Sequence, residues 1–88
     1  MAPVSYIIFK RAGEEFEFPV IFTSNVEHAD MAQRCSGWKV VSAGKVEFRV
    51  TEMGEPILNC YGKSVTLGIF SRDDLDTNLV NEWFKRDW

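Results

Sequence analysis

Apolar side chains dominate two short segments near the N-terminus, and their pattern predicts a pair of β-strands. Residues 4–9 are mostly β-branched or aromatic, which favours a strand. Between Phe16 and Phe22 apolar side chains recur at every second position, the period of a half-buried strand. Gly13 lies among charged residues between these segments and predicts a hairpin turn. Because Pro19 has no N–H to donate, the second strand is expected at a sheet edge or at a bulge.

Two other segments have the pattern of amphipathic helices. A capping box, in which a carboxylate follows a hydroxyl residue by three positions, begins at Ser24 and again at Ser71. A helix is expected over about residues 25–35 after the first box and over about 73–85 after the second. The apolar stripe of the second helix comprises Leu75, Leu79, Val80 and Trp83.

The middle of the chain returns to a period of two. Three further strands are expected, at residues 38–41, 45–51 and 57–61. The second of them alternates most regularly and places Val46, Phe48 and Val50 on one apolar face. Residues 42–44 interrupt the pattern as a bulge or a tight turn, and residues 62–68 read either as a loop or as a short strand.

The order of these elements, β-β-α-β-β-α, indicates an α+β fold. Short connections between strands are typical of a mainly antiparallel sheet, here of four or five strands. We expect both helices to pack on one face of this sheet. With 88 residues, the chain is expected to form a single domain over residues 1–88. Its 45% hydrophobic and 14% aromatic content excludes intrinsic disorder.

Charge and cysteine content exclude several classes of protein. Ten basic residues are scattered among thirteen acidic ones, for a net charge of −3, which disfavours nucleic-acid binding. Cys35 and Cys60 lie in apolar segments and are expected to be reduced thiols, since a small secreted domain normally carries more cysteines. The apolar runs are far shorter than the roughly 20 residues of a membrane helix. Because the N-terminal residues lack the pattern of a signal peptide, we expect a cytoplasmic protein.

The patterns of catalytic and metal-binding residues are all incomplete, so we expect no enzyme activity, cofactor or metal. Residues 62–64, Gly-Lys-Ser, lack the earlier glycine and the following helix of a phosphate-binding loop. His28 is the single histidine, and Cys35 lies about 10 Å away from it along an ideal helix. A nucleophile–base pair of Cys60 with His28 remains geometrically open. The aspartates that open the second helix resemble a calcium loop without its glycine and distal glutamate.

Several short blocks of sequence share an order and spacing with a known group of proteins. The blocks are Pro-Val-Ile-Phe at 19–22, His28, Val-Ser-Ala-Gly at 41–44, residues 60–68, and Ser71-Arg72 with Asp74 ahead of Leu79-Val80. They resemble a loose group of small uncharacterised accessory proteins encoded by bacteriophages, prophages and related mobile elements. The chain departs from that group at Lys45, where an aromatic residue is usual, and at Lys63, where Glu is usual. The resemblance implies an accessory protein in the cytoplasm of a bacterial host, and it supplies no catalytic residue.

Aromatic and apolar side chains outside the expected core point to a binding role. A sheet with helices on one face leaves its other face to be covered, by a protein partner or by a second copy in a homodimer. The candidate interface residues are Ile21, Tyr61, Phe70, Phe84 and Trp88. The favoured function is a non-catalytic accessory protein that binds a host or phage protein, including a host protein that it would inhibit. The alternative is a small nucleic-acid-binding or regulatory module whose basic face comprises Lys39, Lys45, Arg49 and Lys63.

Overall fold

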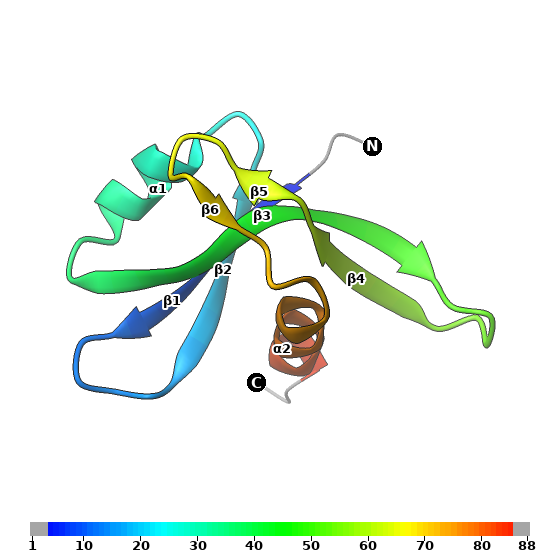
Figure 1. Ribbon diagram of the computed structural model, residues 1–88. Coiled ribbons are helices and arrows are strands. Elements are labelled where there is room, and N and C mark those ends of the chain that lie inside the picture. Colours follow the sequence, from blue (N-terminus) through cyan, green and yellow to red (C-terminus); the bar gives the residue numbers. More distant parts are fainter. Residues whose placement is uncertain (1–3, 86–88) are drawn as a thin grey trace.

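The computed structural model describes residues 4–85, which form six strands and two helices (Figure 1). The elements are β1 (Val4–Arg11), β2 (Glu17–Thr23), α1 (His28–Arg34), β3 (Trp38–Val50), β4 (Pro56–Tyr61), β5 (Lys63–Ser64), β6 (Ile69–Phe70) and α2 (Asp73–Lys85). The α+β class and an antiparallel sheet of four strands are confirmed. The expected element order is not confirmed, because the ambiguous segment after β4 forms a separate two-stranded sheet of β5 and β6.

The four long strands form one antiparallel sheet in the order β2-β1-β3-β4. Strand β2 lies at one edge, as its proline predicts. Strand β3 is continuous, where the sequence pattern suggests two strands. A β-bulge lies just before the expected interruption at residues 42–44: Ile8 lies opposite Ser42 and Phe9 opposite Val40, which leaves Val41 as the extra residue.

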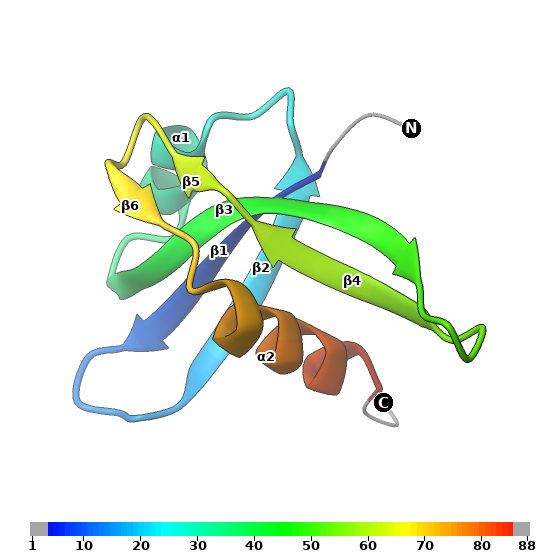
Figure 2. The same cartoon turned by 45° about the vertical axis from the view of Figure 1, so that its right-hand side comes forward.

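Alternate side chains of the central strand β1 belong to two separate parts of the core. Tyr6 and Ile8 pack with Val80 of α2 on one face of the sheet. Ile7 and Phe9 pack on the other face, against α1 and the β5–β6 hairpin. Figures 1 and 2 show α1 and α2 on opposite sides of the sheet. The expectation that both helices share one face is not confirmed, because both sides of β1 are buried and each is covered by a different helix.

Helix α1 has seven residues and is shorter than the sequence pattern predicts. Its N-cap residue is Glu27, which makes no side-chain capping bond, so the capping box expected at Ser24 does not form. The chain turns before the helix instead, and the Val26 N–H donates to the Thr23 carbonyl at 3.1 Å. Gly37 follows α1 with φ 97°, a left-handed conformation that favours glycine and takes the chain out of the helix.

Helix α2 is hydrogen-bonded to the outer edge of β4. Asn81 Oδ1 accepts the N–H of Leu58 at 3.0 Å, and Asn81 Nδ2 donates to the Leu58 carbonyl at 2.8 Å. Thr77 Oγ1 accepts the N–H of Cys60 at 2.9 Å. These side chains bind backbone groups that an edge strand otherwise exposes for pairing with another chain.

The far end of the β3–β4 hairpin extends beyond both helices and is called the arm here (residues 47–57; right side of Figures 1 and 2). The 13 residues of α2 rise about 18 Å, whereas 13 residues of a straight strand such as β3 rise up to about 40 Å. The helix therefore cannot cover the whole apolar face of the strand. Val46 is buried, but Phe48 and Val50 on the same face are 60% and 61% exposed.

Candidate binding surfaces

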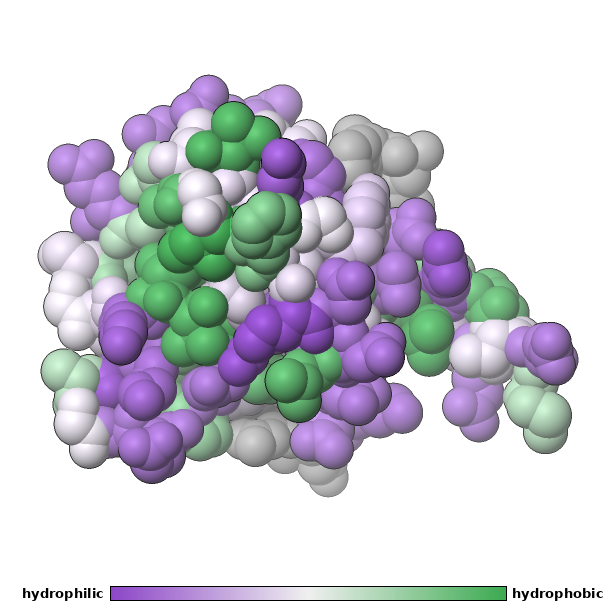
Figure 3. Space-filling view, in the orientation of Figure 1, coloured by the Kyte–Doolittle hydropathy of each residue, from purple (hydrophilic) through white to green (hydrophobic). Residues whose placement is uncertain are grey.

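An apolar surface lies between the arm and the end of α2. We call it the arm surface, and its residues are Phe48, Val50, Pro56, Leu58 and Phe84. Phe48 lies opposite Leu58 and Val50 opposite Pro56 in the β3–β4 ladder, and Phe84 of α2 is 52% exposed. A groove of about 190 Å³ passes between Phe48 and Phe84. Figure 3 shows hydrophobic side chains on the arm, among hydrophilic neighbours.

Of the four candidate interface residues that the structure describes, only Phe84 belongs to the arm surface. Ile21 is half-buried against the core beneath α2, because it lies on the sheet face that the helix covers. Tyr61 is half-buried at the end of β4. Phe70 is exposed on β6, where the Lys63 ammonium lies 5.8 Å from its ring centroid. Trp88 lies outside the described residues.

Sequence reasoning missed the exposed side chains of the arm: Phe48, Val50 and Met53. The alternating pattern places Phe48 and Val50 on an apolar face, but it does not show how far a helix covers that face. The length of the strand carries this information. If residues 38–50 are recognised as one continuous strand, its length predicts that α2 is too short to cover the far end of that strand.

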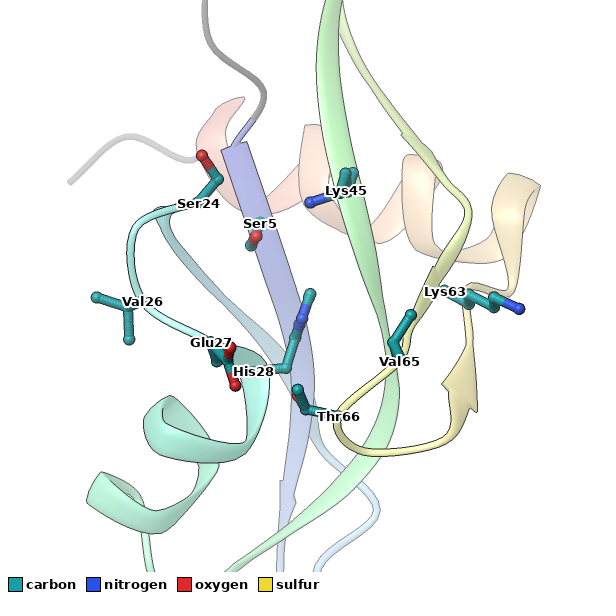
Figure 4. A pocket seen from close by; sticks show the side chains of 9 residues that line it. All are labelled: Ser5, Ser24, Val26, Glu27, His28, Lys45, Lys63, Val65 and Thr66. Atoms are coloured by element: carbon teal, nitrogen blue, oxygen red, sulfur yellow. The ribbon is translucent and has the colours of Figure 1, made fainter.

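A second, polar cavity of about 170 Å³ lies on the opposite face of the sheet, beside α1 (Figure 4). Its lining comes from strands β1, β3 and β5, from the first residue of α1 and from the segments that precede α1 and β6: Ser5, Ser24, Val26, Glu27, His28, Lys45, Lys63, Val65 and Thr66. Among these residues Ser5 and His28 are buried, so the cavity is polar at its base.

The wall of this polar cavity is fixed by hydrogen bonds. His28 Nε2 lies 2.8 Å from the Gly44 carbonyl oxygen, and since a carbonyl only accepts, Nε2 carries the proton and donates. The His28 ring packs edge-on against Phe22, with 5.4 Å between centroids. The Ala29 N–H donates to Thr66 Oγ1 at 3.1 Å, which ties α1 to the β5–β6 loop.

The structure divides the four residues of the candidate basic face. Lys45 and Lys63 both line the polar cavity. Arg49 is paired with Glu47, with 2.7 Å between Nε and Oε1. The bulge in β3 shifts the alternation of its side chains, so Lys39 lies on the other face from Lys45. The four side chains therefore form no single basic face.

A buried polar network joins α2 to the sheet. Asp76 is completely buried, and its Oδ2 accepts the Tyr6 hydroxyl at 2.5 Å. Arg72 Nε donates to Asp76 Oδ1 at 2.9 Å, and Arg72 Nη2 lies 2.8 Å from Glu17 Oε1 of β2. Ser71 Oγ lies 2.6 Å from the Tyr6 hydroxyl. The network positions α2 across β1 and β2.

Cys60 is buried beneath α2, and its thiol is unreactive. Burial, and then the negative charge of Asp76, raises the pKa of its thiol to about 12, so the nucleophilic thiolate is scarce at neutral pH. His28 packs on Phe22 in the opposite part of the core, so the sheet separates the Cys60–His28 pair that the sequence left open. Cys35 also packs on that opposite side, and both thiols are free.

The comparisons with known proteins give no identity. No protein-family model matches the chain. Neither a curated protein nor a solved structure proves similar to it. Among residues 4–85, no group of three or more His, Cys, Asp or Glu side chains is placed to hold a metal ion. No helix in that range has the length and apolar character needed to cross a membrane.

Proposed function

We propose that the protein is a non-catalytic binding protein that contacts another protein through the arm surface. The observation that supports this function is the exposure of Phe48, Val50 and Phe84 on one apolar surface. Exposed apolar patches with a polar rim mark interaction sites in soluble proteins. Fully burying an exposed phenylalanine contributes about 1.5–3 kcal/mol, and since Phe48 and Phe84 are still 60% and 52% exposed, burying each in an interface would contribute roughly 0.8–1.8 kcal/mol.

The arm surface is also held in place before any partner arrives. The two hydrogen bonds between Asn81 and Leu58 fix the end of α2 against β4, and β4 is paired with β3 along its whole length. A preformed surface loses little conformational entropy on binding, so more of the contact energy appears as affinity.

The resemblance to small phage and prophage proteins supports an accessory role with a host or phage protein as the partner. Inhibition of a host protein is one consequence that such a contact would have. The alternative, a nucleic-acid-binding module, has less support because only Lys45 and Lys63 of the candidate basic face border the same cavity. An electrostatic footprint on nucleic acid needs several neighbouring cations.

Affinity capture from a bacterial lysate with matched variants tests the proposal. The arm variant carries Phe48→Ser and Phe84→Ser. The control variant carries Val65→Ser and Leu75→Ser, which remove exposed apolar side chains outside the arm surface, 81% and 64% exposed. We expect the wild type and the control to capture the same protein and the arm variant to lose it. In calorimetry with that protein, each phenylalanine substitution should weaken binding roughly fourfold to twentyfold.

Two results would contradict the proposal. One is a partner that the arm variant binds as tightly as the wild type does. The other is retention of the wild type on heparin or single-stranded DNA at 0.15 M salt that falls steeply as salt rises, which favours the nucleic-acid module. Light scattering separates a homodimer from a hetero-partner: a mass near twice 10.1 kDa that the arm variant loses would assign the arm surface to self-association.

A further inference from the structure

The polar cavity has the composition of a small-molecule site rather than of a gap in the core. Segments from five parts of the chain line it, and they bring together hydroxyl groups, two lysines, a histidine, one glutamate and two valines. Its volume of about 170 Å³ is far above the roughly 10–15 Å³ that a single water molecule needs. Binding sites for small ligands combine such a concavity with a few convergent polar groups.

Lys45 places a positive charge at this cavity. In Figure 4 it extends from β3 across the cavity towards β1, where Ser5 lies. Lys63 points away from the cavity in the same view, and its ammonium lies 5.8 Å from the Phe70 ring centroid. Lys45 is half-buried, so its ammonium is less screened by water than an exposed charge.

Two hydroxyl groups add hydrogen-bond donors. Thr66 Oγ1 already accepts the Ala29 N–H at 3.1 Å, so the hydroxyl proton of Thr66 is available to a ligand. Ser5 is buried at the base of the cavity and contributes a second hydroxyl. An ammonium with two hydroxyl donors is the donor set that an oxyanion requires, since charge-assisted hydrogen bonds to oxyanions are the strong ones.

We propose that the polar cavity binds a small oxyanion, with inorganic phosphate as the probe, held by the Lys45 ammonium and the Ser5 and Thr66 hydroxyls. Glu27 lines the same cavity and opposes the charge of an anion, so it limits the affinity. The site is independent of the proposed protein contact, because it lies on the other face of the sheet from the arm surface.

Titration of the ¹⁵N-labelled protein with sodium phosphate at constant ionic strength tests the site. We expect saturable shifts at the amides of Ser5, Ala29, Lys45 and Thr66, and no such saturation with sodium chloride. The Lys45→Met variant should bind phosphate at least about tenfold more weakly, because it loses a charge-assisted hydrogen bond. Lys39→Met makes the same change of charge on the opposite face and should leave the dissociation constant unchanged.

The Glu27→Gln variant supplies a test that does not depend on the folding of Lys45→Met. Glu27 is exposed, and removing its charge should tighten phosphate binding severalfold. The proposal is overturned if phosphate and chloride give the same shifts. Equal dissociation constants for Lys45→Met and Lys39→Met, or weaker binding by Glu27→Gln, would also overturn it.

Discussion

We expect the buried carboxylate of Asp76 to contribute strongly to the packing of α2 on the sheet. In Asp76→Ala, the Tyr6 hydroxyl and the Arg72 guanidinium lose their common acceptor. Removing one partner of a buried ion pair costs about 3–5 kcal/mol. Arg72 is 30% exposed and keeps Glu17, so we expect the lower end of that range, about 3 kcal/mol.

A loss of this size is large for so small a protein. At about 0.05–0.15 kcal/mol per residue, a domain of 88 residues has an unfolding free energy of roughly 4–13 kcal/mol. Since 1 kcal/mol lowers the Tm of such a domain by about 4–8 °C, Asp76→Ala should lower it by roughly 12–24 °C. Urea denaturation followed by tryptophan fluorescence gives the free energy directly.

Asp74→Ala is the matched control, because Asp74 lies in the same first turn of α2 and is exposed. Its loss removes only an interaction with the helix dipole, worth about 0.3–1 kcal/mol. In a double-mutant cycle, Tyr6→Phe and Asp76→Ala should be non-additive by at least about 0.5 kcal/mol, since the two side chains share a hydrogen bond. If Asp76→Ala costs no more than Asp74→Ala, or if the cycle is additive, the reasoning about this network is wrong.

Two further predictions concern the same side of the sheet. The free energy of unfolding should fall as the pH rises from about 9 to about 12. The pKa of the Cys60 thiol is raised from 9.0 to about 12 in the folded state, so the unfolded chain loses this proton first and is favoured as the pH rises. Burial also raises the pKa of the Tyr6 hydroxyl, which acts in the same direction. Urea titrations at several alkaline pH values check this, and a stability that stays constant or rises would contradict it. Asn81→Ala should cost about 1–3 kcal/mol, because both its hydrogen bonds to Leu58 are lost, whereas the exposed Asn78→Ala should cost less than about 0.5 kcal/mol. Urea denaturation of the two variants checks this difference. Equal losses of unfolding free energy would contradict the stabilising role of the Asn81 hydrogen bonds to β4.

Local patterns in the sequence predicted much of the fold. The β-branched and aromatic composition of β1 and the period of two in β2 located those strands to within a few residues, and β4 was located equally well. Pro19 located an edge strand because its missing N–H is a property of the residue itself. The capping box at Ser24 failed, because the turn at Thr23 to Val26 and the tertiary bond from Ala29 to Thr66 decide where α1 begins.

What the sequence could not supply is the relation between elements. The five apolar residues 6–9 and 22 show that β1 and β2 are buried, but the pattern does not say that two helices cover them from opposite sides. The exposure of Phe48 follows from the length of α2 relative to β3, a comparison of two elements distant in the chain. The polar cavity likewise brings together Ser5 and Lys45, which are opposite each other in the sheet, and Thr66 of the β5–β6 loop. No local sequence motif predicts this arrangement.

The hydrogen bonds of β4 restrict how any partner can contact the arm. The N–H groups of Leu58 and Cys60 point away from β3 and are bound by α2 side chains. Since strand direction alternates with a period of two, the nitrogen of Pro56 points the same way, and proline has no N–H. These outward positions leave no backbone donor free to pair with an added strand. A protein that binds the arm surface would therefore recognise side chains such as Phe48 and Phe84 rather than extend the sheet at its β4 edge, which is why their substitution is the sharpest test of the proposed function.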